Sequence, residues 1–192
     1  MKLGLILVAL TGTAHGDERG AAVSVGGLGQ LDVSDRTDEF GDPEIEAYSG
    51  VRATIGWEPP PTPYPIVRGL RAGGAIVPEL VVGALLHEST TELLFGAGVR
   101  AELRLVQREG GWFRVNSRSS LYLAARGMLV GKDREVVLEG VFGDHLSPGD
   151  SPVRFGFEVG MTARRTDGME DRAGAIVQVY LGYGPPPTAP SR

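Results

Sequence analysis

Hydrophobic and polar residues alternate along most of the chain between residues 20 and 184. Successive side chains of a β-strand point to opposite faces, so a period of two predicts strands with one apolar face and one polar face. The alternation extends from Val153 to Arg164, where valine, phenylalanine and methionine alternate with arginine, glutamate and glycine. Segments of this kind are predicted at 20–31, 44–58, 66–79, 91–107, 117–131, 134–143, 152–165 and 172–184.

The predicted strands are long, and most are joined by short turn-forming sequences such as Glu109-Gly110-Gly111 and Thr166-Asp167-Gly168. Strands of globular proteins cluster near 5–6 residues, whereas a tilted membrane strand needs roughly 9–11 residues. The segments cover about 10–17 residues each, and hairpin-sized links are typical of up-and-down barrels. The sequence therefore predicts an all-β fold: an up-and-down antiparallel β-barrel of about eight strands, embedded in a membrane.

The stretch from Arg68 to His87 departs from the pattern. Pro78 has no backbone N–H to donate, so it predicts a bulge, a sheet edge or a strand end. The apolar run from Leu80 to Leu86 after it does not alternate. We interpret the stretch as an overlong third strand with a kink.

The charged faces are predicted to line the barrel interior. Glycine on a strand face that points into water weakens the strand and brings no packing benefit. The interior of a narrow eight-stranded barrel has little space, so small residues are needed there beside the arginines. Charges of both signs recur on these faces, and charges enclosed in a barrel must pair. The predicted interior network consists of Glu46, Arg52, Arg100, Glu102, Arg104, Arg126, Arg154, Glu158 and Arg164, and the same faces also carry Glu58, Arg71 and Glu139.

The apolar faces are predicted to contact lipid, with Phe95, Val99, Phe155, Phe157 and Val159 as representative residues. Aromatic residues near segment ends are predicted to lie at the bilayer interfaces. These aromatic residues are Trp57, Trp112, Phe113, Tyr122 and Tyr183. The alternative is a soluble periplasmic barrel whose charges face water and whose apolar side chains line a pocket for a lipid or other apolar ligand.

The first sixteen residues are predicted to be a signal peptide. Lys2 supplies a positive start, Leu3–Leu10 an apolar core, and Ala14-His15-Gly16 a small-x-small cleavage site. The predicted domains are therefore the signal peptide 1–16, one β-barrel domain over 17–184, and a proline-rich tail over 185–192. Export to the bacterial outer membrane is expected, with the periplasm as the alternative location.

Composition narrows the possible partners. The chain has 192 residues, 29 of them glycine, no cysteine, and a formal net charge of −5. It has no basic stripe to meet phosphates, which argues against nucleic acid as a partner. We expect membrane lipid as the partner and no cofactor.

With its predicted signal peptide, the alternation from Val153 to Arg164, and the final strand Ala175–Tyr183, the chain resembles the small outer-membrane β-barrel proteins of Gram-negative bacteria. The resemblance covers roughly residues 20–184 and is one of class. Members of that class usually end on an aromatic residue, whereas here Gly184 and the tail follow Tyr183. An eight-stranded barrel whose interior is closed by paired charges is too narrow for bulk solute transport, so we expect a structural or loop-mediated interaction role.

Two sets of residues are candidates for chemistry. His87 and Ser89 fall on one strand face beside a turn, and with Glu102 as the orienting acid they would make a membrane-lipid hydrolase. The alternative is a plain polar turn. The acidic segment from Asp32 to Glu44 offers Asp35, Asp38 and Asp42 as oxygen ligands for a hard cation such as Ca²⁺. A solvated loop is the alternative for this segment, because its spacing does not match a cation-binding loop.

Overall fold

The computed structural model describes residues 20–37, 40–59, 62–67, 70–107, 117–132, 135–148, 151–165 and 171–184. At 35–36, 62–67, 70–72, 105–107 and 117–118 it describes the backbone alone. The predicted signal peptide and the tail at 185–192 lie outside these ranges. All the regular structure in them is β-strand. No helix in this part of the chain is long and apolar enough to cross a membrane.

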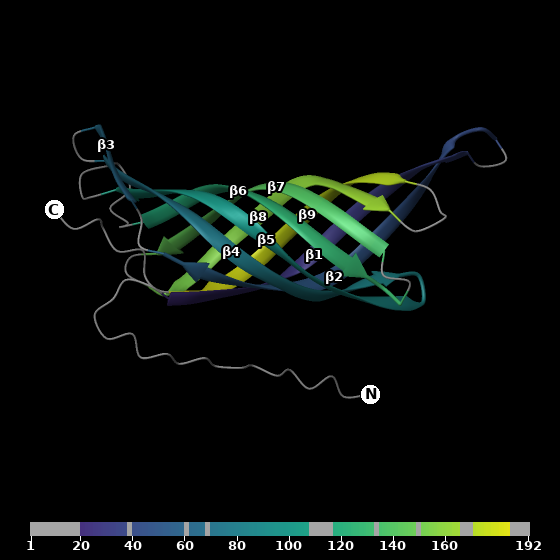
Figure 1. The fold of residues 1–192 in the computed structure, drawn as a ribbon, viewed down its shortest axis with the longest axis horizontal. Coiled ribbons are helices and arrows are strands. Elements are labelled where there is room, and N and C mark those ends of the chain that lie inside the picture. The colour runs from purple at the N-terminus through teal and green to yellow at the C-terminus, as the bar shows by residue number, and fades with distance from the viewer. Residues whose placement is uncertain are drawn as a thin grey trace, which may run out of the picture.

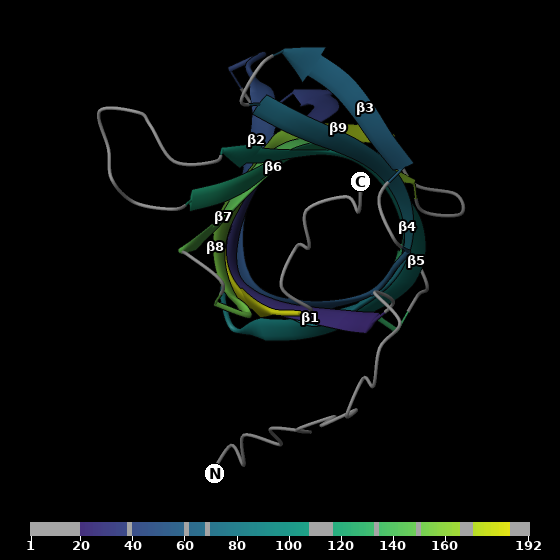
Figure 2. The same cartoon turned by 90° about the vertical axis from the view of Figure 1, so that its left-hand side faces the viewer.

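The strands form one antiparallel sheet, which closes into a barrel (Figures 1 and 2). In chain order they are β1 Gly20–Thr37, β2 Pro43–Glu58, β3 Thr62–Val67, β4 Leu70–His87, β5 Thr90–Gln107, β6 Ser117–Val130, β7 Glu135–Pro148, β8 Val153–Arg165 and β9 Arg172–Tyr183.

Eight strands complete the ring, each pairing with two neighbours in it, and β4 pairs with β3 as well. The sheet order is β2-β1-β9-β8-β7-β6-β5-β4-β3, and an additional pairing of β2 with β4 closes the barrel. The short β3 pairs only with the first residues of β4. The prediction of an up-and-down barrel of about eight strands is confirmed. We call the end where β1 begins and β9 ends the terminal end, and the opposite end, where a turn joins β4 to β5, the hairpin end.

Besides β4, two strands continue well beyond their predicted ends. β1 continues to Thr37 instead of ending at residue 31, and β7 continues to Pro148 instead of residue 143. The prediction that the segment from Asp32 onward is a loop is therefore wrong over its first residues. Asp32 extends the alternation, since its side chain is buried in the lumen while Leu31 and Val33 point outward.

The stretch around Pro78 forms a single strand. β4 pairs with β5 from Leu70 to His87 without a shift in register, so there is no bulge against β5. The ladder between β2 and β4 ends at the pair Gly56–Glu79, next to Pro78, so the missing N–H lies at a ladder end. The predicted limits 66–79 cover only half of this strand. The run Leu80–Leu86 hides its alternation because its inward positions, Val81 and Leu85, are also apolar.

Glycines of the lumen make room for two tyrosine rings. Tyr122 lies opposite Gly143 in the β6–β7 ladder, and Tyr180 lies opposite Gly156 in the β8–β9 ladder. A Cβ atom on either glycine would collide with the facing ring. The glycine-rich inner faces predicted from the sequence therefore allow large side chains to lie flat against the wall of a narrow barrel.

Candidate functional site

The centre of the lumen holds five arginines and five glutamates in one connected set of ion pairs, which we call the lumen network. Its members come from six of the eight barrel strands, and each is at most 7% exposed. They are Arg52, Arg100, Arg104, Arg126, Arg154, Glu58, Glu79, Glu102, Glu139 and Glu158. The equal numbers of positive and negative side chains leave the network neutral as a whole.

One ion pair crosses the full width of the barrel. Arg52 on β2 contacts Glu139 on β7 with its Nη1 2.6 Å from Oε2, and donates a further hydrogen bond to Glu158 on β8. In the strand order, β2 and β7 are separated by three strands on either side, so they face each other across the lumen. The Arg52–Glu139 pair therefore blocks the middle of the barrel.

Arg126 on β6 pairs with three glutamates of the network. Its guanidinium lies 2.9 Å from Glu79, 2.7 Å from Glu139 and 2.6 Å from Glu158. The Tyr122 hydroxyl donates to Glu158 at 2.9 Å and lies 2.9 Å from the Tyr180 hydroxyl. Each additional donor offsets part of the cost of removing these carboxylates from water.

The part of the network nearer the terminal end is richer in arginine. Glu58 on β2 accepts hydrogen bonds from Arg154, and a third contact brings Arg100 to 3.3 Å. Glu102 pairs with Arg100 at 2.8 Å and with Arg104 at 2.7 Å. Three arginines therefore face two glutamates here, and Glu79, 3.0 Å from Arg100, links this part to Arg126.

A second, smaller set of charges lies toward the hairpin end. Arg164 on β8 lies 2.6 Å from Glu135, 3.0 Å from Glu92 and 3.8 Å from Asp32. Its guanidinium also stacks over the Tyr48 ring at 4.8 Å. Glu46, which was predicted to belong to the interior network, lies in this smaller set instead. It pairs with Arg172, and its side chain is 19% exposed.

The structure thus places all nine predicted interior charges on the inner wall, in two groups instead of one. Glu58 and Glu139, recognised only as polar-face residues, pair with several arginines each. Glu79 was missed because it follows Pro78 in the stretch without visible alternation, although it shares parity with Val77 and Val81, which also point inward.

The predicted outer residues do lie on the outside. Phe95, Val99, Phe155, Phe157 and Val159 are between 42% and 55% exposed. Of the predicted interface aromatics, Trp57 and Tyr183 are exposed near the terminal end, whereas Trp112 and Phe113 lie outside the described residues. The assignment of Tyr122 to an interface is wrong. Its ring is only 2% exposed and points into the lumen, because it shares parity with Arg126 and not with Leu121 and Leu123.

The hydrolase arrangement is not assembled. His87 ends β4 and stacks on Tyr48 with ring centroids 4.7 Å apart, and Ser89 is exposed in the two-residue turn that follows. Glu102 lies opposite Ala75, twelve residues along β4 from His87. At the usual rise per residue that separation is about 40 Å. Glu102 instead pairs with two arginines, so it cannot orient His87.

The structure tests the predicted cation site in part and contradicts the predicted apolar pocket. Asp42 is exposed, while Asp38 and the side chain of Asp35 lie outside the described part. Within that part, no three His, Cys, Asp or Glu side chains come together to hold a metal ion. The apolar lining that the soluble alternative requires is contradicted, because side chains such as Phe155 and Phe157 point away from the lumen.

No family model and no curated protein matches this chain. Among solved structures, it is similar to the crystal structure of Ail, the attachment invasion locus protein of Yersinia pestis. The match covers 86% of this chain and 97% of that chain, at 8% sequence identity and a TM-score of 0.26. The barrel itself is established by the strand pairing described above.

Proposed function

We propose that this chain is a membrane-spanning barrel of a bacterial outer membrane, with a closed lumen and a structural or interaction role. The observation that carries the proposal is the distribution of side chains, which is the reverse of a soluble protein. Ten charged groups are buried in the lumen network, while thirty-one large hydrophobic residues are exposed, most of them on strands around the ring. A soluble monomer rarely exposes a contiguous apolar patch above a few hundred Å².

The outer face is also nearly free of charge. Among strand residues with described side chains, only Asp144 and Arg165 carry a charge on this face. On β5 the apolar outer positions run from Leu93 to Leu103. This is about 33 Å along the strand, or about 25 Å along the barrel axis at a usual tilt of about 40°. The apolar band of known membrane barrels has a similar height of about 25 Å.

The lumen network supports a role other than transport. An eight-stranded barrel is only wide enough for its own side chains, and the Arg52–Glu139 pair spans that width. We infer that the barrel anchors its loops at the membrane surface and does not conduct solutes.

Two measurements test the proposal. The full chain is expressed in a Gram-negative host, and its fractionation and heat-modifiable gel migration are followed. We expect it in the outer-membrane fraction, extractable only with detergent; monomeric protein that stays soluble in detergent-free buffer would overturn the membrane assignment. Purified barrel in a planar bilayer is expected to give no steady conductance. A steady open channel would instead overturn the closed lumen and leave the membrane assignment intact.

A further inference from the structure

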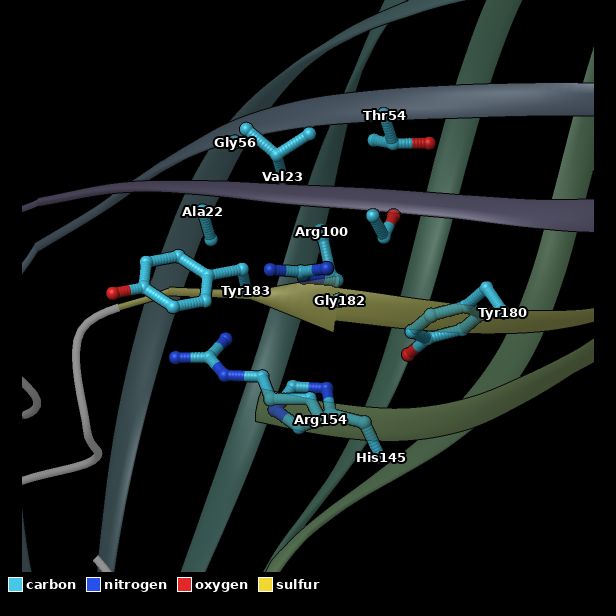
Figure 3. A pocket seen from close by; sticks show the side chains of 11 residues that line it. Ala22, Val23, Thr54, Gly56, Arg100, His145, Arg154, Tyr180, Gly182 and Tyr183 are labelled. Atoms are coloured by element: carbon cyan, nitrogen blue, oxygen red, sulfur yellow. The ribbon is translucent and has the colours of Figure 1, made fainter. Parts of the chain in front are cut away.

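A recess lies at the terminal end of the lumen, beside Val23 and Tyr183, the last pair of the β1–β9 ladder. The space in it that the centre of a water molecule can occupy is about 20 Å³. This is far below the volume of a pocket for a drug-sized ligand and leaves room for one small group only. Figure 3 shows the side chains of Arg100 and Arg154 approaching the same space, with His145 next to Arg154.

The polar lining of the recess consists of hydrogen-bond donors. Arginine carries five N–H donors and a permanent positive charge, and hydroxyl and imidazole groups can also donate. The carboxylates that pair with the two arginines, Glu58, Glu79 and Glu102, do not line the recess. The polar side chains that do are Ser24, Thr54, Arg100, His145, Arg154 and Tyr180.

The charge balance around the recess favours an anion. The three arginines of this part pair with Glu58 and Glu102, and they share a third glutamate, Glu79, with Arg126 deeper in the barrel. The deeper arginines, Arg52 and Arg126, have Glu139 and Glu158 as well as their share of Glu79. Arg100 is only 7% exposed, and its Nε has no hydrogen-bond partner among the described residues. The Arg100 guanidinium has already lost most of its water on folding. An anion that enters the recess can therefore accept hydrogen bonds from it with little further cost of desolvating the arginine.

We propose that this recess binds a phosphate group. A tetrahedral phosphate has enough oxygens to accept from two guanidinium groups and several hydroxyls at once, whereas a carboxylate has only two. The exposed Tyr183 forms part of the rim, so a phosphate arriving in water and one carried by a lipid headgroup can both reach the site.

Isothermal titration of the full-length folded barrel in a maltoside detergent, free of phosphate, tests the site. The probes are inorganic phosphate and a short-chain phosphatidic acid, with acetate as the carboxylate control. We expect phosphate to bind at least tenfold more tightly than acetate. Equal affinity for inorganic phosphate and acetate, or no binding of either phosphate source, would overturn the proposal. Tighter binding of the phosphatidic acid assigns the site to a lipid headgroup, and equal binding assigns it to free phosphate.

Variants localise the binding. Arg154→Gln is expected to weaken phosphate binding at least tenfold and His145→Gln several-fold. Arg172→Gln, at the hairpin end, should leave the affinity within twofold of the unmodified chain. If Arg154→Gln fails to show the heat-modifiable migration of a folded barrel, Thr54→Val removes a hydroxyl donor instead and should weaken binding several-fold. Unchanged affinity in the folded recess variants would place the phosphate elsewhere and sink the proposal.

The detergent titration with free phosphate does not require the barrel to span a bilayer. A failure here therefore leaves the proposed membrane role untouched, and a soluble barrel that bound phosphate would refute only the membrane role.

Discussion

Arginine placed at the middle of β8 is the most direct test of the outward face. Val159 is the central residue of that strand, and its side chain is 42% exposed. Its cross-strand neighbours are Phe142 on β7 and Val177 on β9, which are also apolar and exposed. In lipid, Val159→Arg should destabilise the folded barrel by about 2–4 kcal/mol, the cost of a cation near the bilayer midplane. In water the same change should be nearly neutral.

The neighbouring outer residue should behave differently. Phe157 lies directly opposite Asp144, the one acidic residue on the described outer face of the strands. An arginine at 157 would therefore face a carboxylate, and an opposite-charge pair across two strands contributes roughly 0.2–1 kcal/mol. We expect Phe157→Arg to cost less than Val159→Arg by about that amount, and the difference to disappear when Asp144 is changed to Asn.

The assay is urea unfolding of the chain folded into phosphatidylcholine vesicles, followed by the fluorescence of tryptophan, including Trp57. Val159→Met is the matched control, because it changes the same position without adding charge. Its free energy of unfolding should stay close to that of the parent. If Val159→Arg and Val159→Met were equally stable in vesicles, the outer face would not contact lipid and the reasoning would be refuted.

Two further predictions concern the lumen. Arg126→Met leaves three carboxylates without their shared arginine, so urea unfolding should show a loss of about 3–5 kcal/mol, whereas Arg165→Met on the exposed rim should stay within about 0.5 kcal/mol; similar losses in both would argue against a special role for the network. Gly143→Ala should cost about 1–3 kcal/mol because the new methyl group meets the Tyr122 ring, whereas Gly140→Ala points into open space and should cost almost nothing. Equal thermal stability of the two alanine variants would contradict the ring packing.

Most of the barrel was predictable because the alternation of apolar and polar residues within each strand shows which side chains point outward and which point into the lumen. The period of two is visible without knowing which strands pair in the sheet. It correctly separates the outward Phe155 and Phe157 from the inward Arg154 and Glu158. It fails where both faces are apolar. In β4, the inward side chains belong to a hydrophobic cluster of the lumen that includes Val81 and Leu85, so the contrast between the faces disappears.

The identity of the inner charges was predictable, but their pairing was not. Parity places Arg52 on the inner wall, yet its partner Glu139 lies 87 residues away on the opposite strand of the ring. Only the order and stagger of the closed barrel bring the two together. For Tyr122, the position near a segment end predicts an interface residue, whereas its parity with Arg126 correctly indicates the lumen.

The lumen network also constrains how the barrel folds. Its partners are far apart in sequence, up to 106 residues between Arg52 and Glu158, and β1 must meet β9 before the ring exists. Until then each guanidinium and carboxylate retains its hydration shell, because shedding that water without a partner costs several kcal/mol per ion. The wall must therefore assemble around a wet interior, with the last waters leaving only after the first and final strands have joined, and such late long-range closure is typical of slow folding.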